Sequence, residues 1–163
     1  MATTPPADTR IGHVHLKVTD LDRAETFYIE ALGMERKGRL GDQAAFLAYG
    51  DYHHHLALNT WHSKGGPTAP VEAPIAGLYH FAVLYPDRKA LANAVKRVLD
   101  FGWKLDGASD HGANYSIYLR DPDENGIELY YDRPPEDWER DADGNLALKN
   151  APFDVEALLE EAD

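Results

Sequence analysis

The stretch Tyr118-Leu-Arg-Asp-Pro-Asp-Glu-Asn-Gly-Ile-Glu-Leu-Tyr130 predicts the end of one strand, a turn and a second strand. Proline, asparagine and glycine gather in the turn, at residues 121–126, as they do in turns generally. Because side chains alternate between the two faces of a strand, Glu128 lies on the face opposite Ile127 and Leu129. A buried carboxylate without a partner is strongly unfavourable. We therefore expect Glu128 to meet either hydrogen-bond donors or a metal ion.

Along the chain one order of elements occurs twice, and this hairpin closes the second copy. In each copy a strand is followed by a helix start, a helix with apolar side chains at helical spacing, and further strands. The predicted strands are 11–18, 34–39, 43–49 and 53–60 in the first copy and 78–85, 103–107, 115–119 and 126–131 in the second, with helices at 21–32 and 89–99. A fixed order repeated within one short chain predicts tandem βαβββ modules, and hence an α+β fold.

The division of the chain follows from this repeat. Module 1 covers about residues 11–62 and module 2 about residues 77–132, within a single domain at 1–134. The segment between them, 63–76, is rich in proline and glycine and is predicted to be a linker. Residues 135–163 form an acidic tail with a helix predicted at its end, at 155–162, and this tail is expected either to pack on a neighbour or to stay mobile.

Composition excludes several classes of function. The chain of 163 residues has no cysteine, so it has no disulfide or thiolate metal site, and a metal must be held by His, Asp or Glu. A formal charge of −12 argues against binding to nucleic acid or anionic lipid. No apolar run approaches the ~20 residues of a membrane span, and the first residues do not resemble a signal peptide. We expect a cytoplasmic protein that acts on a small molecule.

Two histidines occupy equivalent places in the two copies. His13 and His80 each lie near the start of the first strand of a module, where a pseudo-twofold arrangement can bring them together. With Glu128 they make two imidazoles and one carboxylate, a set that leaves open positions on iron(II). His15 shares the face of His13 and competes with it as a ligand. Taken singly, each of these side chains is also compatible with an ordinary hydrogen-bonded residue.

Four segments carry a more specific resemblance. They are Gly12-His-Val-His-Leu-Lys-Val-Thr-Asp-Leu-Asp-Arg23, Tyr52-His-His-His-Leu-Ala-Leu-Asn-Thr-Trp61, Gly107-Ala-Ser-Asp-His-Gly112 and the hairpin that begins at Tyr118. Over about residues 11–134 the chain resembles the vicinal-oxygen-chelate superfamily, and within it the short catechol 2,3-dioxygenases of the type I extradiol group. The hairpin motif is shared with glyoxalases and resistance proteins, so it indicates the fold more than the reaction.

The resemblance implies a ligand set. It places the metal on His13, His80 and Glu128, with iron(II) as the metal and manganese(II) as an alternative, and it leaves His15 to line the pocket. Glyoxalase I enzymes use a second glutamate in the first module, where this sequence is expected to have Leu56. The missing carboxylate favours three ligands and an open site.

The same resemblance implies catalytic residues at His54, His111 and Tyr118. Strand alternation predicts His54 on the face of Leu56, taken as the metal face, with its neighbours in the triplet pointing the other way. Tyr118 follows the loop histidine His111 by seven residues, slightly fewer than in the larger family members. Histidine suits proton transfer at neutral pH.

The implied reaction is opening of a catechol ring by dioxygen beside a hydroxyl-bearing carbon, which gives a 2-hydroxymuconic semialdehyde. A glyoxalase-like isomerase, a metal-dependent thiol transferase and a drug-sequestering binding protein are the alternatives on the same fold. The implied partners are a small aromatic diol, dioxygen and a second copy of the chain in a homo-oligomer. The expected pocket includes Phe46, Trp61 and Tyr130.

Overall fold

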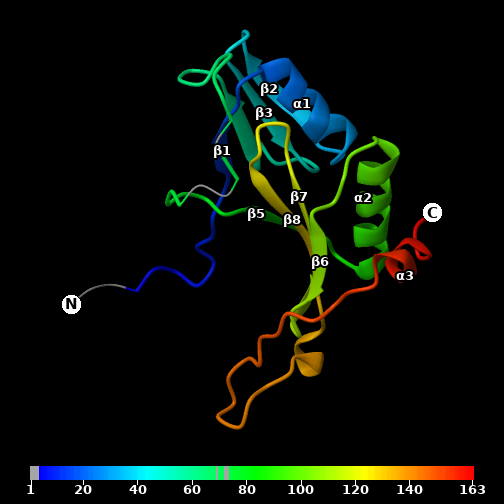
Figure 1. The fold of residues 1–163 in the computed structure, drawn as a ribbon. Coiled ribbons are helices and arrows are strands. Elements are labelled where there is room, and N and C mark those ends of the chain that lie inside the picture. Colours follow the sequence, from blue (N-terminus) through cyan, green and yellow to red (C-terminus); the bar gives the residue numbers. More distant parts are fainter. Residues whose placement is uncertain (1–3, 69, 72–73) are drawn as a thin grey trace.

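The computed structural model describes residues 4–68, 70–71 and 74–163 (Figure 1). The first three residues and positions 69, 72 and 73 of the predicted linker lie outside the described residues. The described elements follow the predicted order twice and build two separate four-stranded sheets. The α+β fold of two tandem βαβββ modules is therefore confirmed, with the two sheets not closed into one barrel.

The first module forms a mixed sheet in the order β1-β4-β3-β2, with β1 parallel to β4. Its elements are β1 (Val14–Lys17), α1 (Leu21–Glu30), β2 (Glu35–Leu40), β3 (Ala44–Ala48) and β4 (Leu56–Asn59). The side chain of Asp20 caps α1 by accepting a hydrogen bond from the Arg23 amide at 3.0 Å. After the helix, Gly33 takes a φ of +71°, which reverses the chain without a steric penalty.

The second module repeats this plan. Its elements are β5 (Phe81–Leu84), α2 (Arg88–Asp100), β6 (Gly107–Asp110), β7 (Asn114–Arg120) and β8 (Gly126–Asp132), with the sheet order β5-β8-β7-β6 and β5 parallel to β8. Asp87 caps α2 through the Ala90 amide at 2.7 Å. The two modules therefore share strand order, direction and helix capping although few of their residues match.

β1 and β5 each begin three residues later than predicted, and two further predicted strands differ from the structure in other ways. The strand predicted at 103–107 is wrong, because β6 begins only at Gly107 and residues 103–106 are irregular. Trp103 in that segment donates its indole N–H to the carbonyl of Arg120 at 2.7 Å and packs on Phe27. The strand predicted at 53–60 is shorter, since residues 53–55 bend before β4.

The core joins the two modules. Alternate side chains of β1, β4, β7 and β8 meet the apolar faces of α1 and α2 in one buried cluster. Phe27 of α1 lies with its ring 5.0 Å from that of Trp103 in the second module, and Tyr28 lies 6.4 Å from Phe81. The largest buried side chains are Tyr28, Phe27, Leu32, Leu47, Leu56, Leu58, Leu91, Ile117, Leu119, Ile127, Leu129 and Leu158.

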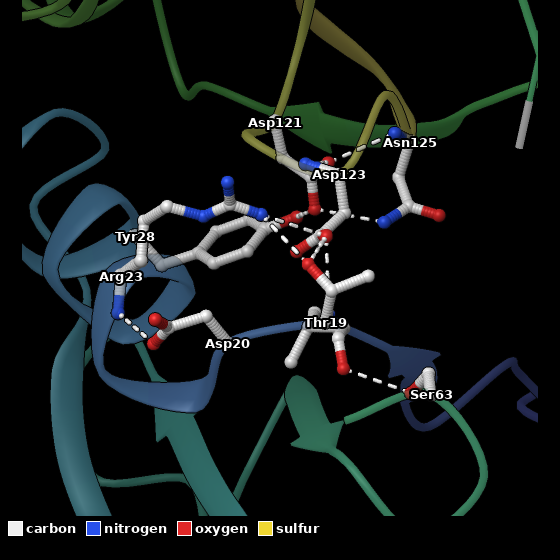
Figure 2. A network of polar contacts seen from close by, with 9 residues as sticks. Thr19, Asp20, Arg23, Tyr28, Ser63, Asp121, Asp123 and Asn125 are labelled. Carbon is white, nitrogen blue, oxygen red and sulfur yellow. Dashed lines mark hydrogen bonds and ion pairs between the residues drawn. The ribbon is translucent and has the colours of Figure 1, made fainter. Parts of the chain in front are cut away.

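A polar network also crosses between the modules (Figure 2). Asp123, in the turn between β7 and β8, accepts hydrogen bonds from the amide and the hydroxyl of Thr19. It also forms an ion pair with Arg23. Asp121 in the same turn accepts a hydrogen bond from the Tyr28 hydroxyl at 2.8 Å. The turn at residues 121–126, through Asp121 and Asp123, therefore holds module 2 against α1; we call these contacts the clamp.

The tail packs on its own chain. A 3₁₀ turn (Pro135–Asp137) is followed by an irregular segment that runs along β6, and then by α3 (Val155–Leu159), which packs on α2 (Figure 1). Leu158 of α3 is fully buried. Among the described residues, no helix combines the length and the apolar character that crossing a bilayer requires.

Candidate metal centre

Glu128 and His80 are brought together by the register of the second sheet. Glu128 on β8 pairs with Ala82 on β5 and with Tyr118 on β7, and His80 directly precedes β5. A side chain at Gly126 would overlap the carbonyl oxygen of Tyr79 and come within 3.0 Å of the His80 side chain. Glycine at the end of the turn therefore lets His80 lie against the start of β8.

The two side chains are in direct contact. His80 Nε2 lies 3.0 Å from Glu128 Oε2, whereas Nδ1 of His80 is buried without a hydrogen-bond partner. The other carboxylate oxygen, Oε1, accepts a hydrogen bond from Ser116 Oγ at 2.5 Å and lies 3.3 Å from the Tyr118 hydroxyl. Glu128 is thus fully partnered although it is only 9% exposed.

His111 and Tyr118 extend this network. His111 Nε2 lies 2.6 Å from the Tyr118 hydroxyl, and His111 Nδ1 lies 2.8 Å from the carbonyl oxygen of Lys149. Burial, with the nearby Glu128 charge, raises the pKa of Tyr118, so its hydroxyl keeps its proton. The structure therefore connects His80, Glu128, Tyr118 and His111 in one chain of polar contacts.

His13 belongs to a second group of histidines, at the end of module 1. The rings of His13 and His54 are 4.5 Å apart, and His54 Nδ1 lies 2.7 Å from Nδ1 of His53. Burial, and next the charge of His13, lowers the pKa of His54; burial, again followed by His13, lowers that of His15. The rings of His54 and His15 therefore favour the neutral form, in which a ring nitrogen can bind a metal or accept a proton.

The predicted ligands are only partly assembled. His80 and Glu128 touch each other, whereas His13 contacts His54. Across the part of the chain that the structure describes, no three His, Asp or Glu side chains lie close enough to hold a metal. His13 and His80 nevertheless line one cavity of about 830 Å³ between the edge strands β1 and β5. The donor types suit a divalent metal, and two of the three predicted donors already converge.

The first-module counterpart of Glu128 is Ala57, so the sequence-based assignment to Leu56 is wrong. Glu128 pairs with the residue two places after His80; two places after His13 is His15, which pairs with Ala57. Leu56 instead pairs with Val14, belongs to the core cluster and also borders the cavity. Residues 53–55 form a bend rather than a strand, and this bend brings His54 against Phe46 and His13. The prediction that His54 shares the face of Leu56 by strand alternation therefore had the wrong reason.

Several smaller expectations have mixed outcomes. Phe46 lies beside His54, with 5.3 Å between the rings, and Trp61 lies 5.4 Å from His15 but is half exposed. His55, expected to point away from the site, is among the residues that line the cavity. Ser116 was missed as a partner of Glu128; its signal was the strand alternation that it shares with Tyr118.

Comparison with known proteins places this geometry in a family. Residues 10–129 match the model of the Glyoxalase/Bleomycin resistance protein/Dioxygenase superfamily, and the chain belongs to that family. This match confirms the resemblance drawn from the four sequence segments. The crystal structure of a lactoylglutathione lyase from Agrobacterium tumefaciens is 26% identical, with a TM-score of 0.59, and the match covers 78% of this chain and 96% of that one.

Several relatives carry the names of dioxygenases, and a probable lactoylglutathione lyase of Arabidopsis thaliana also matches at 30% identity over 128 residues. A catechol-2,3-dioxygenase of Bacillus subtilis is 39% identical over 155 residues, which is 95% of this chain and 53% of that protein. Biphenyl-2,3-diol 1,2-dioxygenase 3 of Rhodococcus globerulus is 30% identical over 132 residues, 81% of this chain and 66% of that protein. The chain therefore spans about half to two thirds of the length of these two dioxygenases.

Proposed function

We propose that this protein is an extradiol dioxygenase that opens catechol or a substituted catechol with dioxygen and gives a 2-hydroxymuconic semialdehyde type of product. The observation that carries the proposal is the contact of His80 with Glu128, with the His111–Tyr118 pair hydrogen-bonded beside it. The 39% identity to a protein named catechol-2,3-dioxygenase supports the same class of reaction.

The metal in this proposal is iron(II), with manganese(II) as the alternative, held by His80, Glu128 and His13. When bound, such a metal supplies the one-electron chemistry that lets dioxygen react with an aromatic ring, which redox-inert zinc does not. The hydrogen bond from Ser116 fixes the Glu128 carboxylate on the side of His80. His13, from the first module, lines the cavity that His80 also lines.

The remaining residues handle protons and orientation. Tyr118 keeps its hydroxyl proton, lies against both Glu128 and His111, and is placed to hydrogen-bond a substrate oxygen. His54, beside His13, favours the neutral form and so acts as a proton acceptor before it acts as a donor. His111 contacts the Tyr118 hydroxyl and passes on the proton that Tyr118 exchanges with the substrate.

A glyoxalase-like isomerase is the second candidate, because a lactoylglutathione lyase shares the fold at 26% identity. Such an enzyme would use the metal as a Lewis acid rather than as an electron carrier. The alanine at position 57, where the first module matches Glu128, offers no second carboxylate for the larger ligand set that the resemblance implies for that enzyme. The ligand set therefore favours the dioxygenase.

Activity decides between the two candidates. The purified protein is loaded anaerobically with iron(II), and catechol, substituted catechols and air are then added. We expect a yellow ring-opened product and consumption of dioxygen. If the iron-loaded protein consumes no dioxygen with any of these diols but isomerises a thiohemiacetal of glutathione, the dioxygenase proposal is wrong.

Metal retention tests the ligands without any turnover. We expect Glu128→Ala and His80→Ala to lose bound iron(II) or manganese(II) after gel filtration, measured by elemental analysis, because each removes one of two converging donors. His54→Ala should keep the metal and turn over slowly. His62→Ala, an exposed histidine, is the matched control and should bind as the natural protein does. Full metal retention in the Glu128 variant would reject this ligand assignment.

A further inference from the structure

The segment 145–153 of the tail, here called the tail strap, lies directly against the candidate site. It runs along β6 (Figure 1), where Asp110 and Ala151 exchange backbone hydrogen bonds at 2.9 and 3.0 Å. Lys149 in this strap places its carbonyl oxygen 2.8 Å from His111 Nδ1. The other nitrogen of the same ring, Nε2, lies 2.6 Å from the Tyr118 hydroxyl.

The chemistry of these atoms leaves one neutral arrangement. A carbonyl oxygen only accepts hydrogen bonds, so the hydrogen of a neutral His111 ring must be on Nδ1. Nε2 then has a free lone pair and accepts the hydrogen bond that the Tyr118 hydroxyl donates. The hydroxyl has a single hydrogen, and its contact with Nε2, at 2.6 Å, is much shorter than its contact with Glu128 Oε1, at 3.3 Å. With the tautomer reversed, the contact with Lys149 would lose its match, because Nδ1 and the carbonyl oxygen would both be acceptors, whereas Nε2–H could still donate to the Tyr118 oxygen.

We propose that the tail strap is part of the site: the Lys149 carbonyl fixes His111 in the Nδ1–H tautomer and so makes Nε2 a proton acceptor toward Tyr118. Lys149 is thereby a positioning residue that acts through its backbone. The proposal deepens the proposed function and rests on it for its catalytic meaning, whereas the tautomer itself is a property of the folded chain.

The strap is held firmly enough to impose this choice. Asn150 hydrogen-bonds Ser109 of β6 through their side chains, and Phe153 stacks on Tyr115 of β7 with ring centroids 4.8 Å apart. Gly112 has a φ of +84°, and a side chain there would come within 3.2 Å of the Ala147 carbonyl oxygen. Glycine next to His111 therefore permits the close approach of the strap.

The charged groups around His111 do not by themselves determine which ring nitrogen carries the hydrogen. Asp110 is paired with Arg133 at 2.6 Å and lies 3.7 Å from the Lys149 ammonium, which in turn pairs with Glu139 at 2.5 Å. These groups are neutralised among themselves in ion pairs. The direct contacts of the ring with the Lys149 carbonyl and the Tyr118 hydroxyl are what distinguish its two nitrogens.

In catalysis this tautomer determines the direction of proton transfer, from the substrate through Tyr118 to His111. In the resting state the His111–Tyr118 pair can accept one proton: the Tyr118 hydroxyl hydrogen moves to Nε2 as the phenol oxygen takes a hydrogen from a substrate hydroxyl. The imidazolium that forms keeps its Nδ1–H bond to Lys149. Without the strap, the Nε2–H tautomer would compete, and that tautomer has no lone pair facing Tyr118.

Nitrogen-15 NMR of metal-free protein with labelled histidines tests the proposal. At about pH 8, above the usual imidazole pKa of about 6.5, the His111 spin system is assigned from its loss in His111→Gln. We expect Nε2, identified by its coupling to Hδ2, at the downfield position of an unprotonated nitrogen, with the proton on Nδ1. A protonated Nε2 in the natural protein would overturn the proposal.

Variants then separate the strap from general folding. Deleting the tail would also remove the buried Leu158, so the test uses Asn150→Ala combined with Phe153→Ala, which loosens the strap and leaves α3 in place. We expect the Nε2 resonance of His111 to move upfield as the second tautomer appears. Leu148→Ala, on an exposed side chain of the same strap, is the control and should leave the resonance unchanged.

Activity is a separate arm of the test. If the protein is a dioxygenase, the double variant should lower kcat on the order of ten-fold while metal binding is retained, as expected when a proton-transfer group is misplaced. If no ring cleavage is found, the proposed function fails and the tautomer result still stands. An unchanged Nε2 resonance in the double variant, with β6 amide shifts proving that the strap has moved, would refute the role of Lys149.

Discussion

At the scale of single residues, Glu128 illustrates what a buried charge demands. The sequence places it among apolar neighbours on β8, which predicts that it has a partner. The structure supplies two close partners from the chain itself, namely His80 and Ser116, and the Tyr118 hydroxyl lies 3.3 Å from Oε1. The cost of burial is therefore offset before any metal arrives, and the hydrogen bonds hold the carboxylate in place for one.

Removing the hydroxyl of Ser116 should weaken metal binding without unfolding the protein. In Ser116→Ala, Oε1 of Glu128 keeps only the 3.3 Å contact with Tyr118, so the carboxylate loses its orientation toward His80. We expect manganese(II) affinity, measured by calorimetry, to fall about 10- to 100-fold. The control is Ser63→Ala, whose hydroxyl bonds the Val18 carbonyl away from the site. Equal affinities of the two variants would contradict this role for Ser116.

The histidines of module 1 show where single-sequence reasoning stops. Alternation along a strand predicted a face for His54, but His54 lies in a bend, and its contacts with His13 and Phe46 follow from the path of that bend. That Ala57 is the first-module counterpart of Glu128 is known only from the pairing of β1 with β4. Register is fixed by contacts far apart in the chain, and one residue of error exchanges the two faces.

At the scale of elements, local chemistry predicts the helices well and the irregular segments poorly. Asp20 and Asp87 start α1 and α2 as capping residues, and both helices end within two residues of their predicted ends. Residues 103–106 were mistaken for a strand because Trp103 and Leu105 are apolar, yet they pack on the core without strand pairing. Their conformation depends on the Arg120 carbonyl, a tertiary contact.

The turn before β8 is an element whose stability can be measured. Tyr28→Phe removes the donor to Asp121, a carboxyl group that is 1% exposed and whose pKa is raised by burial. We expect urea unfolding at neutral pH to show a loss of about 1–3 kcal/mol, because the buried carboxylate loses a hydrogen bond. Tyr79→Phe, at an 83% exposed side chain, should change little.

The pH dependence of this loss has a definite sign. The Tyr28 hydroxyl stabilises the charged form of Asp121, so its removal raises the pKa of that carboxyl further. The difference between Tyr28→Phe and the natural protein is therefore full at neutral pH and shrinks as the pH falls through the raised pKa of Asp121. A difference that grows toward acid pH would contradict the assignment of this hydrogen bond.

At the scale of the whole molecule, the sequence predicts two modules but not how they meet. The repeat of element order established the tandem arrangement, and the family match confirms it. The contact of α1 with the second module, through Phe27 and Trp103, has no signature in either module alone. Pairing with a second copy of the chain stays a prediction.

This shared core predicts that the two modules unfold together. Single-tryptophan variants separate the reporters: Trp61 belongs to module 1 and Trp103 to module 2, with Trp138 in the tail replaced by Phe in both. We expect the two fluorescence transitions in urea to coincide with each other and with circular dichroism, since small domains with one core unfold in a single step. Phe27→Ala, at a side chain 1% exposed, should lower the free energy of unfolding by about 3–5 kcal/mol and move both midpoints together to lower urea. Two distinct midpoints in the natural background would mean that the clamp of Figure 2 and the Phe27 contact do not couple the modules, and that each sheet is stable on its own.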